Sequence, residues 1–162
     1  MRSHFLQVSS NGAQAEGDVY IKRPGRMRIE YDPPTPIEIV ATGTFLVYHD
    51  KDLQQVTWLG MDATPAGILL DDKVSLTGKV TVTGIERDAS ALRVSMIKTD
   101  DPAAGSLTLV FADKPLALKK WTVIDAQGLL TTVALIDPRF GIPLASDLFS
   151  FTDPYRDKPS VR

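Results

Sequence analysis

Few side chains in this sequence could support catalysis or metal binding, and they are scattered along it. His4 lies near the start of the chain, and His49 stands beside acidic residues at a predicted hairpin. A metal site needs several ligands that converge in space, so we predict two surface histidines and no metal site. The chain contains no cysteine, which excludes a thiolate metal site, a cysteine nucleophile and a lipid anchor attached through cysteine.

The carboxylates that lie next to each other in sequence occupy the ends of predicted elements. Asp71 and Asp72 follow a predicted helix, and Asp100 and Asp101 stand at a predicted turn. Aspartate at such places commonly accepts hydrogen bonds from backbone amides. The chain has neither a glycine-rich phosphate loop nor a G-x-S-x-G nucleophile elbow. We therefore predict that the protein is not an enzyme and has no cofactor.

Composition places the chain among ordinary folded proteins. Its 162 residues are 43% hydrophobic and 23% charged, which suits one domain over residues 1–162 with a core of its own. The 18 basic and 20 acidic residues give a formal charge of -2. Nucleic-acid partners usually require a net basic face, so we predict none. The chain contains no apolar run long enough to span a bilayer.

Alternation of apolar and polar residues dominates the sequence and is typical of half-buried strands. Within 26–32, for example, Met27, Ile29 and Tyr31 share one face, and the charged residues share the other. A long sheet has edges and an apolar face that must be covered, so we predict a barrel or a strongly curved antiparallel sheet. About ten strands are predicted, at 19–22, 26–32, 37–42, 44–50, 53–59, 79–87, 91–99, 106–112, 117–125 and 129–136.

One internal stretch predicts a helix. Thr64 suits the N-cap and Pro65 the first helical position, and the apolar residues Ile68, Leu69 and Leu70 follow. The first residues of the chain are already apolar and fit either the end of another helix or the approach to the first strand. We expect a signal peptide and most of an N-terminal helix to lie upstream.

Arg23 is the cation whose position is most informative. The strand alternation places it on the same face as Val19 and Ile21. If that face is concave, Arg23 is a charge at the end of an apolar row, and its five donors could bind the backbone carbonyls of a helix end. The alternative is that its side chain extends to solvent at the strand end. The sequence leaves both open.

These residues also form part of a longer pattern that resembles the LolA family of lipoprotein carriers. The segment from Lys22 to Arg28, which reads Lys-Arg-Pro-Gly-Arg-Met-Arg, is the most specific part of the resemblance. Weaker matches extend it, in order, over nearly the whole chain: Phe5-x-Gln7, Gly17, Tyr31-Asp32-x-Pro34, Ile39-Val40-Ala41-x-Gly43, Tyr48, Asp50, Thr64-Pro65, Leu69-Leu70, Leu107-x-Leu109-x-Phe111 and Phe149-Ser150-Phe151-x-x-Pro154.

The resemblance implies a fold and a function together. The fold would be mainly β, an incomplete, half-open antiparallel barrel covered by short helices that act as a lid. The function would be that of a periplasmic chaperone that moves lipoproteins from an inner-membrane ABC transporter complex to an outer-membrane receptor, and we expect a monomer. Arg23 would hold the lid closed, and Pro65, Ile68, Leu69 and Leu70 would belong to the lid helix. The alternation then predicts which residues line a cavity for lipoprotein acyl chains: Val19, Ile21, Met27, Ile29, Tyr31, Ile39, Leu107, Leu109, Phe111, Trp121 and Val123.

Three alternatives to a lipoprotein carrier stay open. A carrier of another periplasmic lipid, such as a glycolipid or a hopanoid, would use the same cavity. A domain that senses mislocalised lipoproteins would use the same fold together with a partner-binding part. A small hydrolase would need an acid and a base inside the barrel, with Asp125 or Glu30 as candidates.

Overall fold

The computed structural model describes residues 1–63, 66–72 and 75–156. This part of the chain forms eleven strands and one short α-helix, α1 (Ala66–Leu70). The strands are β1 (Arg2–Ser9), β2 (Gln14–Lys22), β3 (Arg26–Tyr31), β4 (Ile37–Thr42), β5 (Phe45–Asp50), β6 (Gln55–Gly60), β7 (Val80–Arg87), β8 (Ala91–Lys98), β9 (Gly105–Asp113), β10 (Leu116–Asp125) and β11 (Leu130–Arg139).

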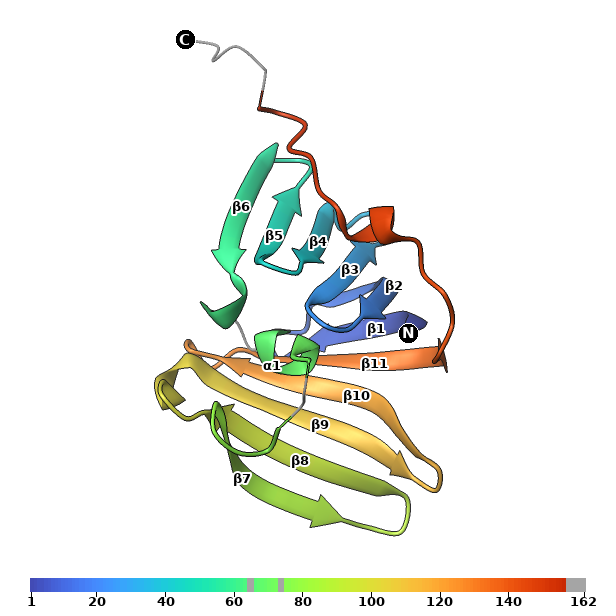
Figure 1. Cartoon of the computed structure of the whole chain (residues 1–162), viewed down its shortest axis with the longest axis vertical. Coiled ribbons are helices and arrows are strands. Elements are labelled where there is room, and N and C mark those ends of the chain that lie inside the picture. Colours follow the sequence, from blue (N-terminus) through green and yellow to red (C-terminus); the bar gives the residue numbers. More distant parts are fainter. Residues whose placement is uncertain (64–65, 73–74, 157–162) are drawn as a thin grey trace.

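All eleven strands of the described residues belong to one antiparallel sheet. Its order is β6-β5-β4-β3-β2-β1-β11-β10-β9-β8-β7, so neighbours in the sheet are neighbours in sequence except where β1 pairs with β11. That pairing joins an N-terminal half, β1 to β6, to a C-terminal half, β7 to β11 (Figure 1). The short hairpin connections explain the order, because antiparallel strands need only tight turns between them.

The sheet does not close, and α1 lies where it is open. The two edge strands, β6 and β7, follow one another in the chain, and the segment that crosses between them carries α1. Figure 1 shows α1 between the two halves of the sheet. The predicted half-open barrel with a short helix over it is confirmed.

Strand alternation divides the sheet into a concave face and an outer face. The concave face carries the main hydrophobic core, because every second residue of the strands points into it. Leu70 of α1 is only 1% exposed and belongs to the same core. The buried members of this core are Phe5, Val19, Ile21, Met27, Ala41, Leu70, Val80, Val94, Met96, Leu107, Leu109, Trp121 and Val133.

The start of the chain is a strand, and not the end of a helix. Residues Arg2–Ser9 pair with β2 on one side and β11 on the other. Phe5 of this strand is buried in the concave core and meets the Tyr31 ring edge-on at 5.4 Å between centroids. The short apolar run could not by itself distinguish a strand from a helix, and pairing on both sides decides the outcome.

The irregular segment at residues 140–156, which we name the C-terminal strap, packs on the outer face of the N-terminal half. It contains the short 3-10 helix η3 (Ser146–Phe149), which packs on β3 and β4. Figure 1 shows the strap running past β3 toward β5 and β6. Phe151 meets the rings of His49 and Trp58 edge-on, at 5.5 and 5.8 Å between centroids.

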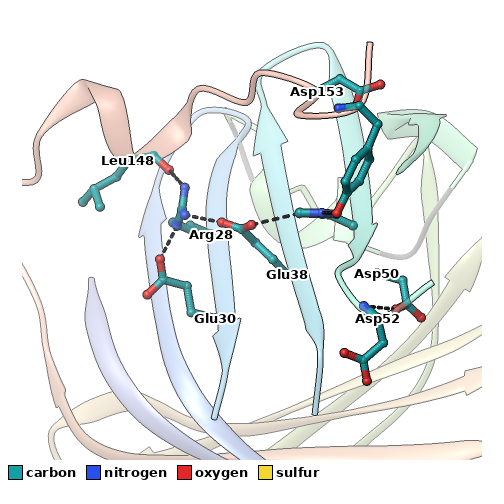
Figure 2. A network of polar contacts seen from close by, with 9 residues as sticks. Arg28, Glu30, Glu38, Asp50, Asp52, Leu148 and Asp153 are labelled. Atoms are coloured by element: carbon teal, nitrogen blue, oxygen red, sulfur yellow. Dashed lines mark hydrogen bonds and ion pairs between the residues drawn. The ribbon is translucent and has the colours of Figure 1, made fainter. Parts of the chain in front are cut away.

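A polar network fastens this strap to the outer face (Figure 2). The guanidinium of Arg28 donates to the Leu148 carbonyl of the strap at 3.2 Å and to the Glu30 carboxylate at 2.5 Å. It also forms an ion pair with Glu38, which is buried. Because a buried charge without a partner is costly, the contacts of Arg28 favour the arrangement in which β3, β4 and the strap lie together.

The prediction that His49 is a surface histidine is wrong. Its side chain is buried, with a residue exposure of 6%. One ring nitrogen lies 3.3 Å from the Glu38 carboxylate and the other lies 3.0 Å from the hydroxyl of Tyr155. Phe151 and Tyr155 of the strap cover the hairpin position where the sequence predicted exposure.

Candidate functional site

The structure has an apolar cavity where the concave face meets the strap, and we name it the end cavity. Its volume is about 630 Å³, within the range of small-molecule sites. Strands β2, β9 and β10, the helix α1 and the start of the strap all contribute to its wall. The lining residues are Met1, Ile21, Lys22, Arg23, Leu69, Leu109, Phe111, Leu118, Phe140, Gly141, Ile142, Pro143 and Leu144.

A second cavity lies on the other side of α1 and has a different character. Its volume is about 680 Å³, and Ile68 and Leu70 of α1 contribute to its wall. Its described lining also includes four aspartates and two lysines: Asp62, Asp71, Asp72, Lys79, Lys98 and Asp100. An acyl chain gains most where apolar atoms surround it, so the end cavity is the better candidate site.

Among the described residues, the buried side chain of Leu70, the packing of Ile68 and Leu69 against the core, and a backbone hydrogen bond hold α1 over the concave face. The backbone N–H of Gly25 donates to the carbonyl of Leu70 at 2.7 Å. Gly25 has a φ of +70° and lies against Gly43, where an added Cβ would come 3.0 Å from the Gly43 Cα. Glycine therefore suits this turn both by its conformation and by the close approach.

Arg23 lies at the end cavity, beside α1. Its side chain is exposed, and it makes no hydrogen bond or ion pair within the described ranges. Burial and then the Arg23 charge lower the pKa of the neighbouring Met1 ammonium. The hydrogen bond to α1 seen in the described residues comes from Gly25, and the lid-holding role of Arg23 stays a prediction. Pro65, the predicted start of the lid helix, lies outside the described residues.

All eleven residues predicted to line a cavity lie on the concave face. Six are buried in the core, namely Val19, Ile21, Met27, Leu107, Leu109 and Trp121, and five pack against it, namely Ile29, Tyr31, Ile39, Phe111 and Val123. Only Ile21, Leu109 and Phe111 among them line the end cavity. The others fill the space between the two halves and α1, so their contact with an acyl chain stays a prediction.

The described residues predicted to belong to the lid helix show a similar division. Leu70 is buried in the core, Leu69 lines the end cavity, and Ile68 lines the second cavity. The sequence reasoning missed the wall made by the strap, which is formed by residues 140–144. This stretch has no strand or helix periodicity, so no pattern marked it. Leu118 was also missed, although its strand was predicted.

The environment of Tyr31 shows how the concave face treats charge. Burial, followed by the effect of Tyr48, raises the pKa of the Tyr31 phenol to about 12. The hydroxyl donates to the side-chain oxygen of Gln7 at 2.8 Å, so the neutral phenol is satisfied. The concave face thus favours uncharged groups.

The hydrolase alternative finds no acid–base pair on the concave face among its named candidates. Asp125 accepts hydrogen bonds from the backbone N–H groups of Gln127 and Leu129, as a turn residue does. Glu30 lies on the outer face and pairs with Arg28.

One group of potential metal ligands lies on the outer surface. His4, Glu16 and Asp32 place ligand atoms within 4.8 Å of one another, and both acids are exposed. None of the three lines the end cavity.

The fold and the cavity define a class: a half-open antiparallel β-barrel whose apolar concave face is covered by a short helix and opens into an apolar cavity. The chain belongs to the LolA family, because residues 1–152 match the family described as outer membrane lipoprotein carrier protein LolA. No helix in the described residues has the length and apolar character needed to cross a bilayer.

Relatives from several bacteria support this assignment. An outer-membrane lipoprotein carrier protein from Methylobacillus flagellatus is 27% identical over 95% of this chain and 78% of its own length. One of the same description from Methylococcus capsulatus is 28% identical over 95% of this chain and 77% of its own length. An uncharacterised conserved protein from Thermus thermophilus has a similar fold, with a TM-score of 0.54 at 10% identity over 94% of this chain and 85% of its own.

Proposed function

We propose that this chain is a periplasmic carrier that binds the acyl chains of lipoproteins and delivers them from the inner to the outer membrane. The observation that carries the proposal is the end cavity, an apolar space of about 630 Å³ bordered by Leu69 of the lid helix. Its position in a LolA-family chain supports lipoprotein as the cargo. In this proposal residues 1–162 act as a single carrier domain, as a monomer and without catalysis.

The proposed exchange has two partners. An inner-membrane ABC transporter complex would supply the lipoprotein, and an outer-membrane receptor would accept it. Family membership supports this route. Both handovers require that the carrier bind acyl chains neither too weakly nor too tightly.

Opening the closed lid costs free energy, and this cost keeps the net affinity for acyl chains low enough for release. Burying a methylene gains roughly 0.8 kcal/mol, so a long acyl chain would gain on the order of 10 kcal/mol gross. Without an opposing cost, release would be slow. Displacing α1 exposes the buried side chain of Leu70 and breaks the Gly25 hydrogen bond, which together cost about 2–4 kcal/mol. The closed, empty state is therefore more stable than the open state, which lowers the net affinity for cargo.

A triacylated lipopeptide and a pair of variants of β10 test the proposal. Leu118 lines the end cavity, whereas Leu116 of the same strand is 64% exposed. We expect Leu118→Glu to weaken lipopeptide binding more than tenfold, because a carboxylate would have to share the apolar cavity. Leu116→Glu carries the same charge change and should bind as the parent does.

The two variants also separate failure of the site from failure of the function. Equal binding by Leu118→Glu and the parent, with circular dichroism showing both folded, would place the cargo elsewhere. Absence of lipopeptide binding by the parent would refute the proposed function. Mass spectrometry of lipids extracted from the purified protein completes the test, since a recovered glycolipid or hopanoid would replace lipoprotein as the cargo.

A further inference from the structure

The end cavity has an unequal distribution of charge. The charged side chains among its described lining residues are Lys22 and Arg23, which are adjacent in sequence and both cationic. No carboxylate accompanies them in that lining. The described lining of the second cavity, by contrast, contains four aspartates and two lysines. Charge at the end cavity is therefore of one sign, beside an otherwise apolar wall.

The described residues leave these two cations without an ionic partner. Arg23 is exposed and forms no ion pair or hydrogen bond there, and Lys22 reaches the Leu144 carbonyl only at 3.5 Å. Arg28, three residues beyond the turn, shows the opposite arrangement, since Glu30 and Glu38 both pair with it. A negative group placed at the cavity would be the first close anion for Lys22 and Arg23.

We propose that the end cavity binds an acyl amphiphile with an anionic head, such as a fatty-acid carboxylate or an alkyl phosphate. The chain would lie among Leu109, Phe111 and Leu118, and the head would contact Lys22 and Arg23. The inference rests on the proposed function in one respect, that this cavity takes acyl chains. It adds a ligand class, because the acylated cysteine of a lipoprotein carries no anionic group at its lipid end.

Two ligands of equal chain length, laurate and dodecanol, isolate the effect of the head. Binding is measured by displacement of the neutral probe phenylnaphthylamine from the whole chain. We expect laurate to bind about tenfold more tightly than dodecanol, because two solvent-accessible cations each contribute a factor of about 2–5. Raising the salt concentration should weaken laurate binding and leave dodecanol binding unchanged.

Charge-removing variants locate the effect. Lys22→Gln and Arg23→Gln should each lower the ratio of laurate affinity to dodecanol affinity about 2–5-fold. Arg26→Gln is the matched control, because Arg26 is exposed, lies opposite Lys22 in the β2–β3 register and does not line the cavity. Dodecyl phosphate should behave as laurate does, whereas inorganic phosphate, which has no chain, should not displace the probe.

The outcomes separate this inference from the proposed function. Equal affinities for laurate and dodecanol would overturn the inference while leaving an acyl-binding cavity. An equal effect of Arg26→Gln would also overturn it, since diffuse positive charge would then suffice. If laurate binds as expected and a triacylated lipopeptide does not, the inference stands and the lipoprotein cargo is refuted. Failure of laurate, dodecanol and lipopeptide alike would overturn both.

Discussion

Replacing Leu70 by alanine should weaken the closed lid and tighten cargo binding. Leu70 is 1% exposed and is the buried α1 residue of the concave core, against which Ile68 and Leu69 also pack. Leu→Ala at a fully buried site costs about 2–5 kcal/mol. The lower part of that range applies here, because α1 has only five residues and can shift to reduce the cavity that the substitution leaves.

A loss of about 2–3 kcal/mol from the closed state sets the size of the effect on binding. If an acyl chain must displace the Leu70 side chain, the variant no longer bears that cost. Each 1.4 kcal/mol corresponds to about tenfold in affinity, so the variant should bind a triacylated lipopeptide about 30–150-fold more tightly. It should also transfer the lipopeptide more slowly to acceptor membranes.

Hydrogen exchange provides a second measurement on the same variant. The amide of Gly25 donates to the Leu70 carbonyl, so its exchange should become faster when the lid opens more often. Leu76→Ala is the matched control, since Leu76 is 46% exposed and lies in the same crossing segment between β6 and β7. Unchanged or weaker lipopeptide binding by a folded Leu70→Ala variant would refute the claim that the cost of opening the lid lowers the affinity for cargo.

Three further predictions concern the outer face, the concave face and the cation at the lid. Glu38→Gln should lower the free energy of unfolding, measured by urea titration, by about 2–3 kcal/mol, because it leaves Arg28 partly unpaired. Glu30 also pairs with Arg28 but is more exposed, so Glu30→Gln should lower the free energy of unfolding by less than about 1 kcal/mol. Since burial raises the pKa of Tyr31 to about 12, well above that of a phenol in water, the folded state holds the phenolic proton more tightly. That stability is complete below pH 10 and about 2 kcal/mol should be lost as the pH rises toward 12, and Tyr31→Phe should remove this part of the pH dependence. Arg23→Leu should retain lipopeptide more strongly and transfer it less if Arg23 holds the lid, and transfer equal to the parent's would exclude that role.

The sequence predicted the concave face well because one physical rule governs it. A strand that buries one face must alternate, and the residues from Val19 to Val123 chosen on that basis all lie on the core side. The helix at Ala66–Leu70 was predictable for a related reason, since its run of apolar residues is local. The predicted N-cap Thr64 lies outside the described residues. Neither rule depends on contacts between distant parts of the chain.

The outer face was less predictable because a distant segment covers part of it. His49 reads as a hairpin residue among acids, yet Tyr155 lies 3.0 Å from its ring and Phe151 packs against it. The strap that brings these rings is irregular and rich in proline, and it is held by specific contacts such as that of Arg28 with the Leu148 carbonyl. Contacts of this kind produce no periodic pattern in the sequence, so the sequence did not predict them.

The same strap makes the end cavity harder to predict than the fold. Leu109 and Phe111 on β9 supply one side of the end cavity, and residues 140–144 supply another. A closed barrel would bury these strand residues against other strands, leaving its interior filled. Here the sheet stays open between β6 and β7, so a lid and a strap border the space instead. Displacing either of them would break no strand pair, so the proposed carrier would admit an apolar chain while its sheet remains intact.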